Sequence, residues 1–399
     1  MVSSNIDSYS SDKTLSFLLA SYCALLPFEE ALAGIFGSVL KIAGVAVIAY
    51  ALVALVRQRV VIGSIGCLVP FYIWFFVCLV SYFWCADETY YLYFLSIYGF
   101  QLVFISVIVL SQKILDTRCF LRGLIIAGVV ASALIVFFSN TETYTDEGRK
   151  TIILFNRALD PNIVASILML SIMSCMVFIF EYKRTEKRYI AFALFILFGM
   201  LSTGSRGALI SFVVSFALGL FLEFKTPENK NKAVTLLILA IVAALLMQLL
   251  LPENLLETRF STKTILGLNE YNNGSHSRYR IWQSAAILIP QSPLLGFGCG
   301  SFMDTLATIY RHAASHNVYV LVTVEEGIVG LLPFLAGLIY LLLNLIKRHK
   351  PMYVAMLFSV CFMGLTLDSI TYKYFWIAIA LSALVIEADK SKLGGVSAK

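Results

Sequence analysis

Charged side chains are scarce in this sequence. They make up 14% of its 399 residues, whereas 59% are hydrophobic and the mean hydropathy is +0.85. A typical soluble domain carries about 25% charged residues. The scarcity of charge therefore excludes an ordinary soluble fold, and no nucleic-acid partner is predicted.

Cysteine frameworks are also lacking. The eight cysteines lie mostly in apolar runs, as Cys23, Cys78 and Cys175 do, and no CxxC or Cys/His spacing joins them. This pattern indicates neither a zinc site nor a disulfide scaffold. The cysteines are expected to pack as small apolar residues, and no metal or cofactor is predicted.

Long apolar runs are abundant. A membrane-spanning helix needs about 20 apolar residues, and runs of that length follow one another almost throughout the chain. They do not alternate with polar residues, so helices are expected rather than a barrel. The sequence predicts an all-α polytopic membrane protein with one integral membrane domain, residues 1–399. We expect about 12 transmembrane helices, near residues 14–33, 36–56, 60–84, 90–111, 121–139, 161–181, 189–203, 206–224, 233–251, 318–346, 352–367 and 371–388.

The distribution of lysine and arginine predicts the orientation. Short cytoplasmic loops carry the excess of these residues, and most of them fall on one side if both termini are cytoplasmic. Residues 252–315 then form one long external loop. Its residues Tyr279, Ile281, Trp282 and Ala285 recur at helical spacing, which predicts an amphipathic helix that ends near Pro290.

Several arginines remain on the external side, where the orientation rule disfavours them. Arg206 lies in Thr-Gly-Ser-Arg-Gly between two apolar runs, and Arg278 and Arg280 begin the predicted external helix. They indicate an anionic ligand, since a guanidinium can bind a phosphate through two hydrogen bonds. Arg278 and Arg280 lie on different faces of a helix, so at most one of them is expected to point at a given site. Arg278 is the predicted phosphate ligand. Snorkelling to lipid headgroups and interfacial anchoring are the alternatives.

Two other motifs are weaker. Residues 296–301, Gly-Phe-Gly-Cys-Gly-Ser, look like a phosphate-binding loop but follow no strand, so a Rossmann site is rejected and a turn is expected. His312 and His316 have the spacing of a metal pair but lack a third ligand. Ser205 lacks the first glycine of a hydrolase GxSxG motif, where Thr203 stands.

His316 and Asn317 lie where a polar segment enters an apolar run. A histidine titrates near neutral pH, and Glu325, Glu326 and Asp368 could orient it or adjust its pKa. The alternative is a structural histidine at a helix start with Asn317 as the cap.

These motifs occur together in an order that resembles the O-antigen ligase and polymerase superfamily. The residues are Ser202–Leu209, Arg278 with Trp282, Pro293–Gly298, and His316-Asn317 followed by Glu326–Gly330. The resemblance is strongest from residue 160 to residue 370.

The resemblance implies a GT-C-like, metal-independent, inverting glycosyltransferase in the bacterial inner membrane, with its active site on the periplasmic face. The implied donor is a glycan on undecaprenyl pyrophosphate. His316 would be the general base, Arg206 and Arg278 would hold the pyrophosphate, and the expected supporting residues are Arg157, Arg280, Asn317, Tyr319, Glu325, Glu326 and Asp368.

Three functions remain open. The first choice is a ligase, for which the acceptor is a sugar of the lipid A core. The second is a polymerase, for which the acceptor is another lipid-linked repeat unit. A transporter or flippase for an anionic or lipid-linked glycan is the third alternative, because polytopic helices with buried arginine also describe transporters.

Overall fold

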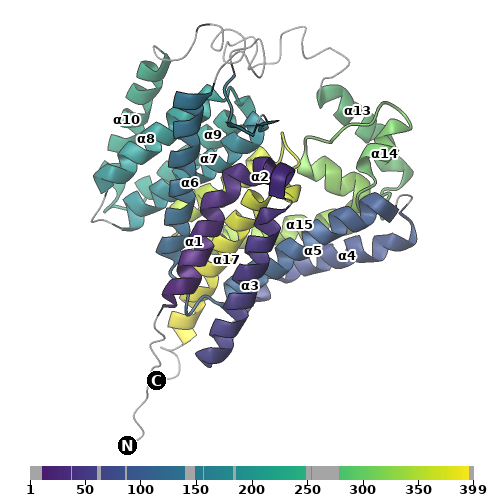
Figure 1. Cartoon of the computed structure of the whole chain (residues 1–399), viewed down its shortest axis with the longest axis horizontal. Helices are drawn as coiled ribbons and strands as arrows, with labels where there is room; N and C mark the ends of the chain where they lie inside the picture. The colour runs from purple at the N-terminus through teal and green to yellow at the C-terminus, as the bar shows by residue number, and fades with distance from the viewer. Residues whose placement is uncertain are drawn as a thin grey trace, which may run out of the picture.

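The computed structural model of the protein describes residues 11–36, 38–60, 64–85, 88–139, 149–155, 157–182, 186–248, 253 and 278–394. Helices predominate in these residues (Figure 1). The sheet found among them is a hairpin of β1 (Ile153–Leu154) and β2 (Arg157–Ala158). The predicted all-α class is therefore confirmed.

The helices follow the predicted apolar runs closely. In chain order they are α1 (Lys13–Leu25), η1 (Leu26–Phe28), α2 (Glu29–Phe36), α3 (Val39–Arg57), η2 (Gly66–Leu68), α4 (Val69–Val80), η3 (Ser81–Phe83), α5 (Glu88–Leu110), α6 (Thr117–Phe138), α7 (Pro161–Glu181), α8 (Glu186–Ser202), α9 (Arg206–Phe224), α10 (Lys230–Gln248), α13 (Arg278–Leu288), η7 (Ile289–Gln291), α14 (Phe302–Ala307), α15 (Val318–Lys347), α16 (Pro351–Met363), η8 (Ser369–Thr371) and α17 (Lys373–Gly394).

Each of the twelve predicted spans overlaps one of these helices. Eight helical segments of the described chain are long and apolar enough to cross a membrane. Of the helices that overlap the twelve predicted spans, α8, α10, α16 and α17 are outside that set. The polytopic character is thus confirmed, whereas the count of twelve spans and the GT-C-like arrangement stay predictions.

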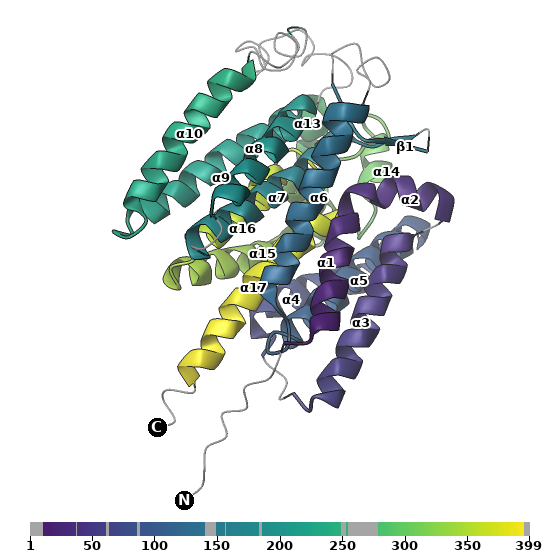
Figure 2. The ribbon, with the colours of Figure 1, turned by 60° about the vertical axis from the view of Figure 1, so that its left-hand side comes forward.

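Helices α7 and α17 form the centre of the bundle. All of the apolar stretch of α7 is buried, and α17 is buried along most of its described length. A helix that is apolar on every side is expected inside a bundle. Helix α7 packs against α6, α8 and α16, and α17 packs against α5, α15 and α16. Helix α10 lies at the rim against α9 (Figure 2).

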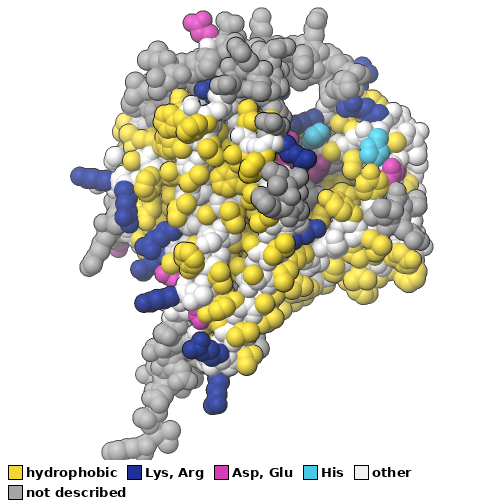
Figure 3. All heavy atoms as spheres, in the orientation of Figure 1, with side chains coloured by type: hydrophobic (Ala, Val, Ile, Leu, Met, Phe, Trp, Pro, Cys, Tyr) yellow, Lys and Arg dark blue, Asp and Glu magenta, His cyan; other side chains and the backbone are white. Residues whose placement is uncertain are grey.

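The outer surface suits a lipid environment. Apolar side chains cover much of the face in Figure 3, and lysine and arginine side chains gather along its lower left. Two histidines lie at the upper right, beside charged side chains. Helix α1 begins and α17 ends at the same end of the bundle (Figure 1), as an even number of crossings requires. Which end faces the cytoplasm stays a prediction.

The long helix α15 is interrupted at Gly327, which the apolar run 318–346 did not reveal. Gly327 has φ 62° and ψ −162°, and a Cβ there would lie 2.3 Å from the carbonyl oxygen of Leu294. Residues with positive φ are rarely anything but glycine. The break frees backbone groups of α15, and the loop before α14 binds them: Phe297 N donates to Val324 O at 2.9 Å, and Ile328 N donates to Pro293 O at 3.0 Å.

The helix predicted to end near Pro290 is confirmed as α13, which is followed by the 3-10 turn η7 that contains Pro290, whereas its external location stays a prediction. It buries Ile281, Ala285 and Leu288 and packs against α14 and α15. The rest of the predicted loop, residues 252–277, lies outside the described residues apart from Glu253.

Candidate functional site

The turn at Ser315–Asn317 is tied down from several sides. Asn317 caps α15, because its side-chain oxygen accepts hydrogen bonds from Tyr319 N at 3.0 Å and Val320 N at 3.1 Å. The role of Asn317 as a helix cap, which was an alternative from the sequence, is therefore confirmed. Trp282 of α13 donates from Nε1 to Ser315 O at 3.0 Å. The external helix and the start of α15 are thus held in one unit.

Asp368, the residue before η8, holds the same turn through its side chain. Its Oδ1 accepts hydrogen bonds from the Ser315 hydroxyl and from Asn317 N, the latter at 3.1 Å. The Ser315 hydroxyl in turn accepts from Asn317 N at 3.1 Å. One carboxylate oxygen therefore fixes the backbone on both sides of His316.

His316 adopts a conformation that few residues take. Its φ is 51°, which only a few per cent of non-glycine residues adopt and which costs energy wherever it occurs. The side chain is half-buried, and Nδ1 has no hydrogen-bond partner among the described residues. Nδ1 is itself buried, so the turn holds an imidazole with one buried nitrogen that makes no hydrogen bond to the described residues.

Burial lowers the pKa of His316 below its usual value, and the positive charges of Arg278 and Arg311 lower this pKa further. The carboxylates of Asp368 and Asp160 act in the opposite direction. A lowered pKa keeps the ring neutral near pH 7, the state in which it can accept a proton.

The Thr203–Gly207 junction is a tight turn between α8 and α9. Gly204 has φ 63°, and Ser205 is the N-cap of α9. The buried guanidinium of Arg149 braces the turn: Nε donates to Thr203 O at 3.0 Å, and Nη2 donates to the Asn162 side chain at 3.2 Å. The Ser205 hydroxyl bonds the same Asn162 oxygen at 3.0 Å.

This junction lies beside the segment that carries Asp368. A Cβ on Gly207 would lie 2.5 Å from Oγ1 of Thr366, so α9 begins in close contact with that segment. Arg206, the first residue of α9, is partly exposed. The starts of α7, α9 and α15 and the residues before η8 therefore converge, although the first and last of these segments lie more than 200 residues apart.

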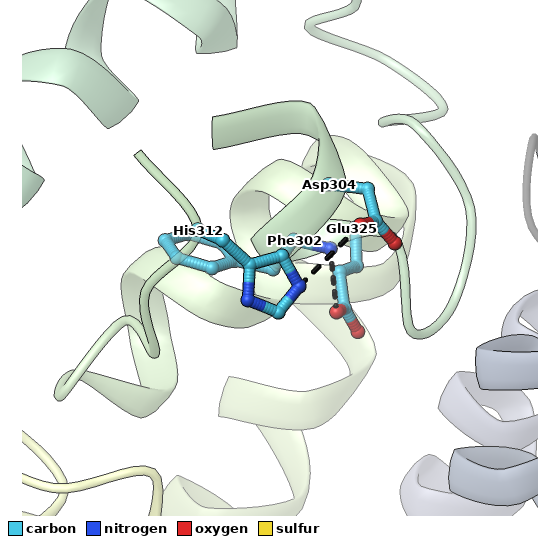
Figure 4. A network of polar contacts seen from close by, with 4 residues as sticks. All are labelled: Phe302, Asp304, His312 and Glu325. Atoms are coloured by element: carbon cyan, nitrogen blue, oxygen red, sulfur yellow. Dashed lines mark hydrogen bonds and ion pairs between the residues drawn. The ribbon is translucent and has the colours of Figure 1, made fainter. Parts of the chain in front are cut away.

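Glu325 organises the glycine-rich loop. It is 3% exposed, and its Oε1 accepts from Phe302 N at 3.2 Å (Figure 4). Gly298 N donates to Glu325 O at 2.8 Å, and Cys299 N donates to the Ser81 hydroxyl at 2.9 Å. Since these amides already bind the protein itself, the loop is a turn, as expected, and not an anion cradle. His312 pairs with Asp304 of α14 at 3.4 Å, and Figure 4 shows this pair next to the contact between Phe302 and Glu325.

A cavity of about 640 Å³ opens next to the turn at Ser315–Asn317. Ser315, Asp368 and Glu325 form one part of its wall. The remaining lining combines charged and aromatic side chains, including Glu29, Glu30, Lys41, Lys373, Tyr90, Tyr93, Phe94 and Tyr372. Lys373 is buried and forms an ion pair with Glu29. His316, Arg206 and Arg278 are not among the lining residues, although His316 directly follows Ser315, which is.

The other predicted site residues occupy varied positions. Arg157 lies on the exposed hairpin strand β2, and Arg280 is exposed on α13. The Tyr319 hydroxyl donates to Cys361 O at 2.8 Å, so it ties α15 to α16. Glu326 is 1% exposed and faces Cys78 of α4.

Sequence reasoning missed three residues at this site. Asp160, the N-cap of α7, lies near His316, and only the Asp-Pro-Asn helix start could have drawn attention to it. Arg149, which is 8% exposed, was not singled out as a site residue. Lys41 had no explanation within a predicted span, and the structure places it on the cavity wall.

The fold and the site define a polytopic helical membrane protein whose polar residues meet at one end of the bundle. The family model for O-antigen ligase matches residues 190–335, which include Arg206, Arg278, His316 and both glutamates of α15. The resemblance to the O-antigen ligase and polymerase superfamily is confirmed over that stretch.

One similar relative is a Haemophilus influenzae protein described as uncharacterized. It is 27% identical over 184 residues, which cover 41% of this chain and 45% of the relative. The chain therefore matches less than half of that relative's length.

Proposed function

We propose that this protein is a glycosyltransferase that transfers an O-antigen glycan from undecaprenyl pyrophosphate to a sugar hydroxyl of the lipid A core. The reaction would take place at the periplasmic face of the inner membrane. The observation that carries the proposal is the turn at His316, where a largely neutral imidazole lies near Arg278 and next to Ser315 of the cavity wall, and its buried Nδ1 has no hydrogen-bond partner among the described residues.

The proposed reaction is one displacement. His316 takes the proton of the acceptor hydroxyl while the oxygen attacks the anomeric carbon, and the bond from that carbon to the pyrophosphate oxygen breaks. Undecaprenyl pyrophosphate leaves with the bonding electrons. Attack from the side opposite the leaving group inverts the anomeric configuration.

Arg206 and Arg278 have the role of stabilising the charge that develops on the leaving pyrophosphate. Fixed guanidinium groups stabilise such charge best where water is excluded. Both arginines begin helices that pack around the same convergence of segments, α9 and α13. Asp368 is proposed as a positioning residue, because its carboxylate holds the turn that carries His316.

The cavity suits the glycan. Aromatic rings pack on the apolar faces of sugars, while carboxylates and ammonium groups bind hydroxyls, and this cavity offers both kinds of lining. Its volume lies within the range of sites that bind compact ligands, so it would hold the sugars nearest the reacting bond.

The test uses purified protein in detergent with a glycan on undecaprenyl pyrophosphate. Supplied with lipid A core, the protein is expected to form a new glycosidic bond, detected by mass spectrometry. Without a core acceptor but with a second lipid-linked repeat unit, a ligase forms no product and a polymerase does. Detergent leaves no compartments, so a transporter would give neither product.

A further inference from the structure

Three side chains unrelated to the proposed chemistry meet between α4, the glycine-rich loop and α15. They are Cys78, Cys299 and Glu326, whose exposed fractions are 0%, 0% and 1%. One potential ligand atom from each lies within 4.8 Å of the other two. Cys78 and Cys299 are separated by more than 200 residues, so no sequence spacing could indicate this cluster.

The Glu326 carboxyl group is only half satisfied. Oε1 accepts a weak hydrogen bond from the Cys78 thiol at 3.4 Å. Oε2 is buried and has no hydrogen-bond partner in the part of the chain that the structure describes. An unsatisfied buried carboxyl oxygen is costly, which calls for a further partner beside the two thiols.

We propose that Cys78, Cys299 and Glu326 bind one thiophilic divalent cation, of which zinc is the best match. Two thiolates and a carboxylate are ordinary zinc ligands, at about 2.3 Å and 2.0–2.2 Å from the metal. Ligand atoms around such an ion lie closer together than 4.8 Å, so small side-chain movements complete the site. Water completes the tetrahedron.

Binding releases the protons of both thiols and of the buried Glu326 carboxyl group to solvent. The two charges of the ion cancel those of the two thiolates, so the carboxylate is the one ligand whose negative charge remains. Zinc changes no oxidation state in this step, and no further reactant is needed.

The role of the ion is structural. Its three ligands join α4, the loop at residues 296–301 and the part of α15 next to the break at Gly327. Phe302, which directly follows this loop, donates its amide to Glu325, which lines the cavity. The cation would hold this cavity wall in place and would take no part in glycosyl transfer, so the inference is independent of the proposed reaction.

Metal binding to the whole purified protein tests the proposal. The protein is reduced, treated with a chelator, freed of both reagents and titrated with zinc or cadmium chloride. One ion per chain, a cadmium–thiolate absorption band and a higher Tm in zinc are expected. Cys78→Ala and Cys299→Ala should lose the band, and Glu326→Gln should weaken binding about tenfold or more. Cys175→Ala, a buried cysteine of α7, is the matched control and should bind as the unaltered protein does.

Three results would overturn the proposal: no ion bound by the reduced protein, binding that Cys78→Ala and Glu326→Gln leave unchanged, or a Cys78–Cys299 disulfide in protein purified without reductant. If the cysteine variants fail to fold, X-ray absorption of the unaltered protein with zinc decides. Two sulfur ligands support the site, and a shell of oxygen and nitrogen alone rejects it.

Discussion

The turn at Ser315–Asn317 and the loop at Gly296–Phe302 differ in how they use their polar groups. Both are polar segments that enter the apolar bundle, and the loop resembles a phosphate-binding sequence more closely. Yet the loop amides bind Val324, Glu325 and Ser81. The turn keeps Nδ1 of His316 without a partner among the described residues and holds it in a conformation that costs energy. The resemblance of the loop to a phosphate-binding sequence therefore does not identify the candidate site.

The largest effect is expected from His316→Ala. If the imidazole takes the acceptor proton, its removal should lower the transfer rate by about 10²–10⁴-fold. The rate is measured with purified protein and lipid-linked donor, and an unchanged Tm serves as the folding control. A variant that transfers at the full rate would remove the turn from the reaction.

Arg278→Ala should produce the next largest effect. Loss of a charge-assisted hydrogen bond costs about 1.5–3 kcal/mol, which corresponds to a decrease in kcat/KM for the donor of roughly 10–150-fold. Arg280→Ala removes the same charge two residues away from an exposed position and is the matched control. Equal losses in both variants would mean that general charge, and not the placement of Arg278, matters. Arg206→Ala is expected to behave like Arg278→Ala.

The structural role of the loop and of the break in α15 is tested by Gly327→Ala. A methyl group there would meet Leu294 O at 2.3 Å and would require a positive φ of an alanine. We expect a loss of stability of about 1–3 kcal/mol, measured as a lower Tm in detergent. Gly66→Ala is the control, because only the Ser64 hydroxyl lies near that position, at 3.1 Å. Similar Tm values for the two variants would show that the break tolerates a side chain.

The smallest effect is a shift in pH dependence. Burial and the charge of Arg278 lower the pKa of His316, and the Asp368 carboxylate partly offsets this by raising the same pKa. Asp368→Asn removes that charge, so the acidic limb of the transfer rate should move to lower pH, together with a modest fall in rate. Asp304→Asn, next to His312 on the surface, should leave the limb in place. A shift to higher pH in Asp368→Asn would contradict the electrostatic assignment.

The fold could be predicted from the sequence to a large extent, because helix formation in a membrane depends on local apolar runs. The helix over Arg278–Leu288 and the cap at Asn317 follow from local patterns and are confirmed. The break at Gly327 could not be predicted, since it depends on a loop that binds the freed backbone groups. A glycine within an apolar run does not reveal such a partner.

The site could be predicted less completely. His316 and Arg278 stood out because polar residues are rare beside apolar runs. Asp160 and Arg149 did not, because their importance depends on contacts with residues far away in the chain. The association of Cys78 with Cys299 is missed for the same reason.

The pH dependence of transfer by the unaltered protein tests the central claim most directly. A base with a lowered pKa loses activity only when the pH falls through that lowered value, because protonation then occupies the nitrogen that must accept the proton. We predict that log kcat/KM for the acceptor stays level down to pH 6.5, the usual pKa of histidine, and falls below it. An acidic limb at or above pH 6.5, or a limb that persists unchanged in the residual activity of His316→Ala, would contradict the account.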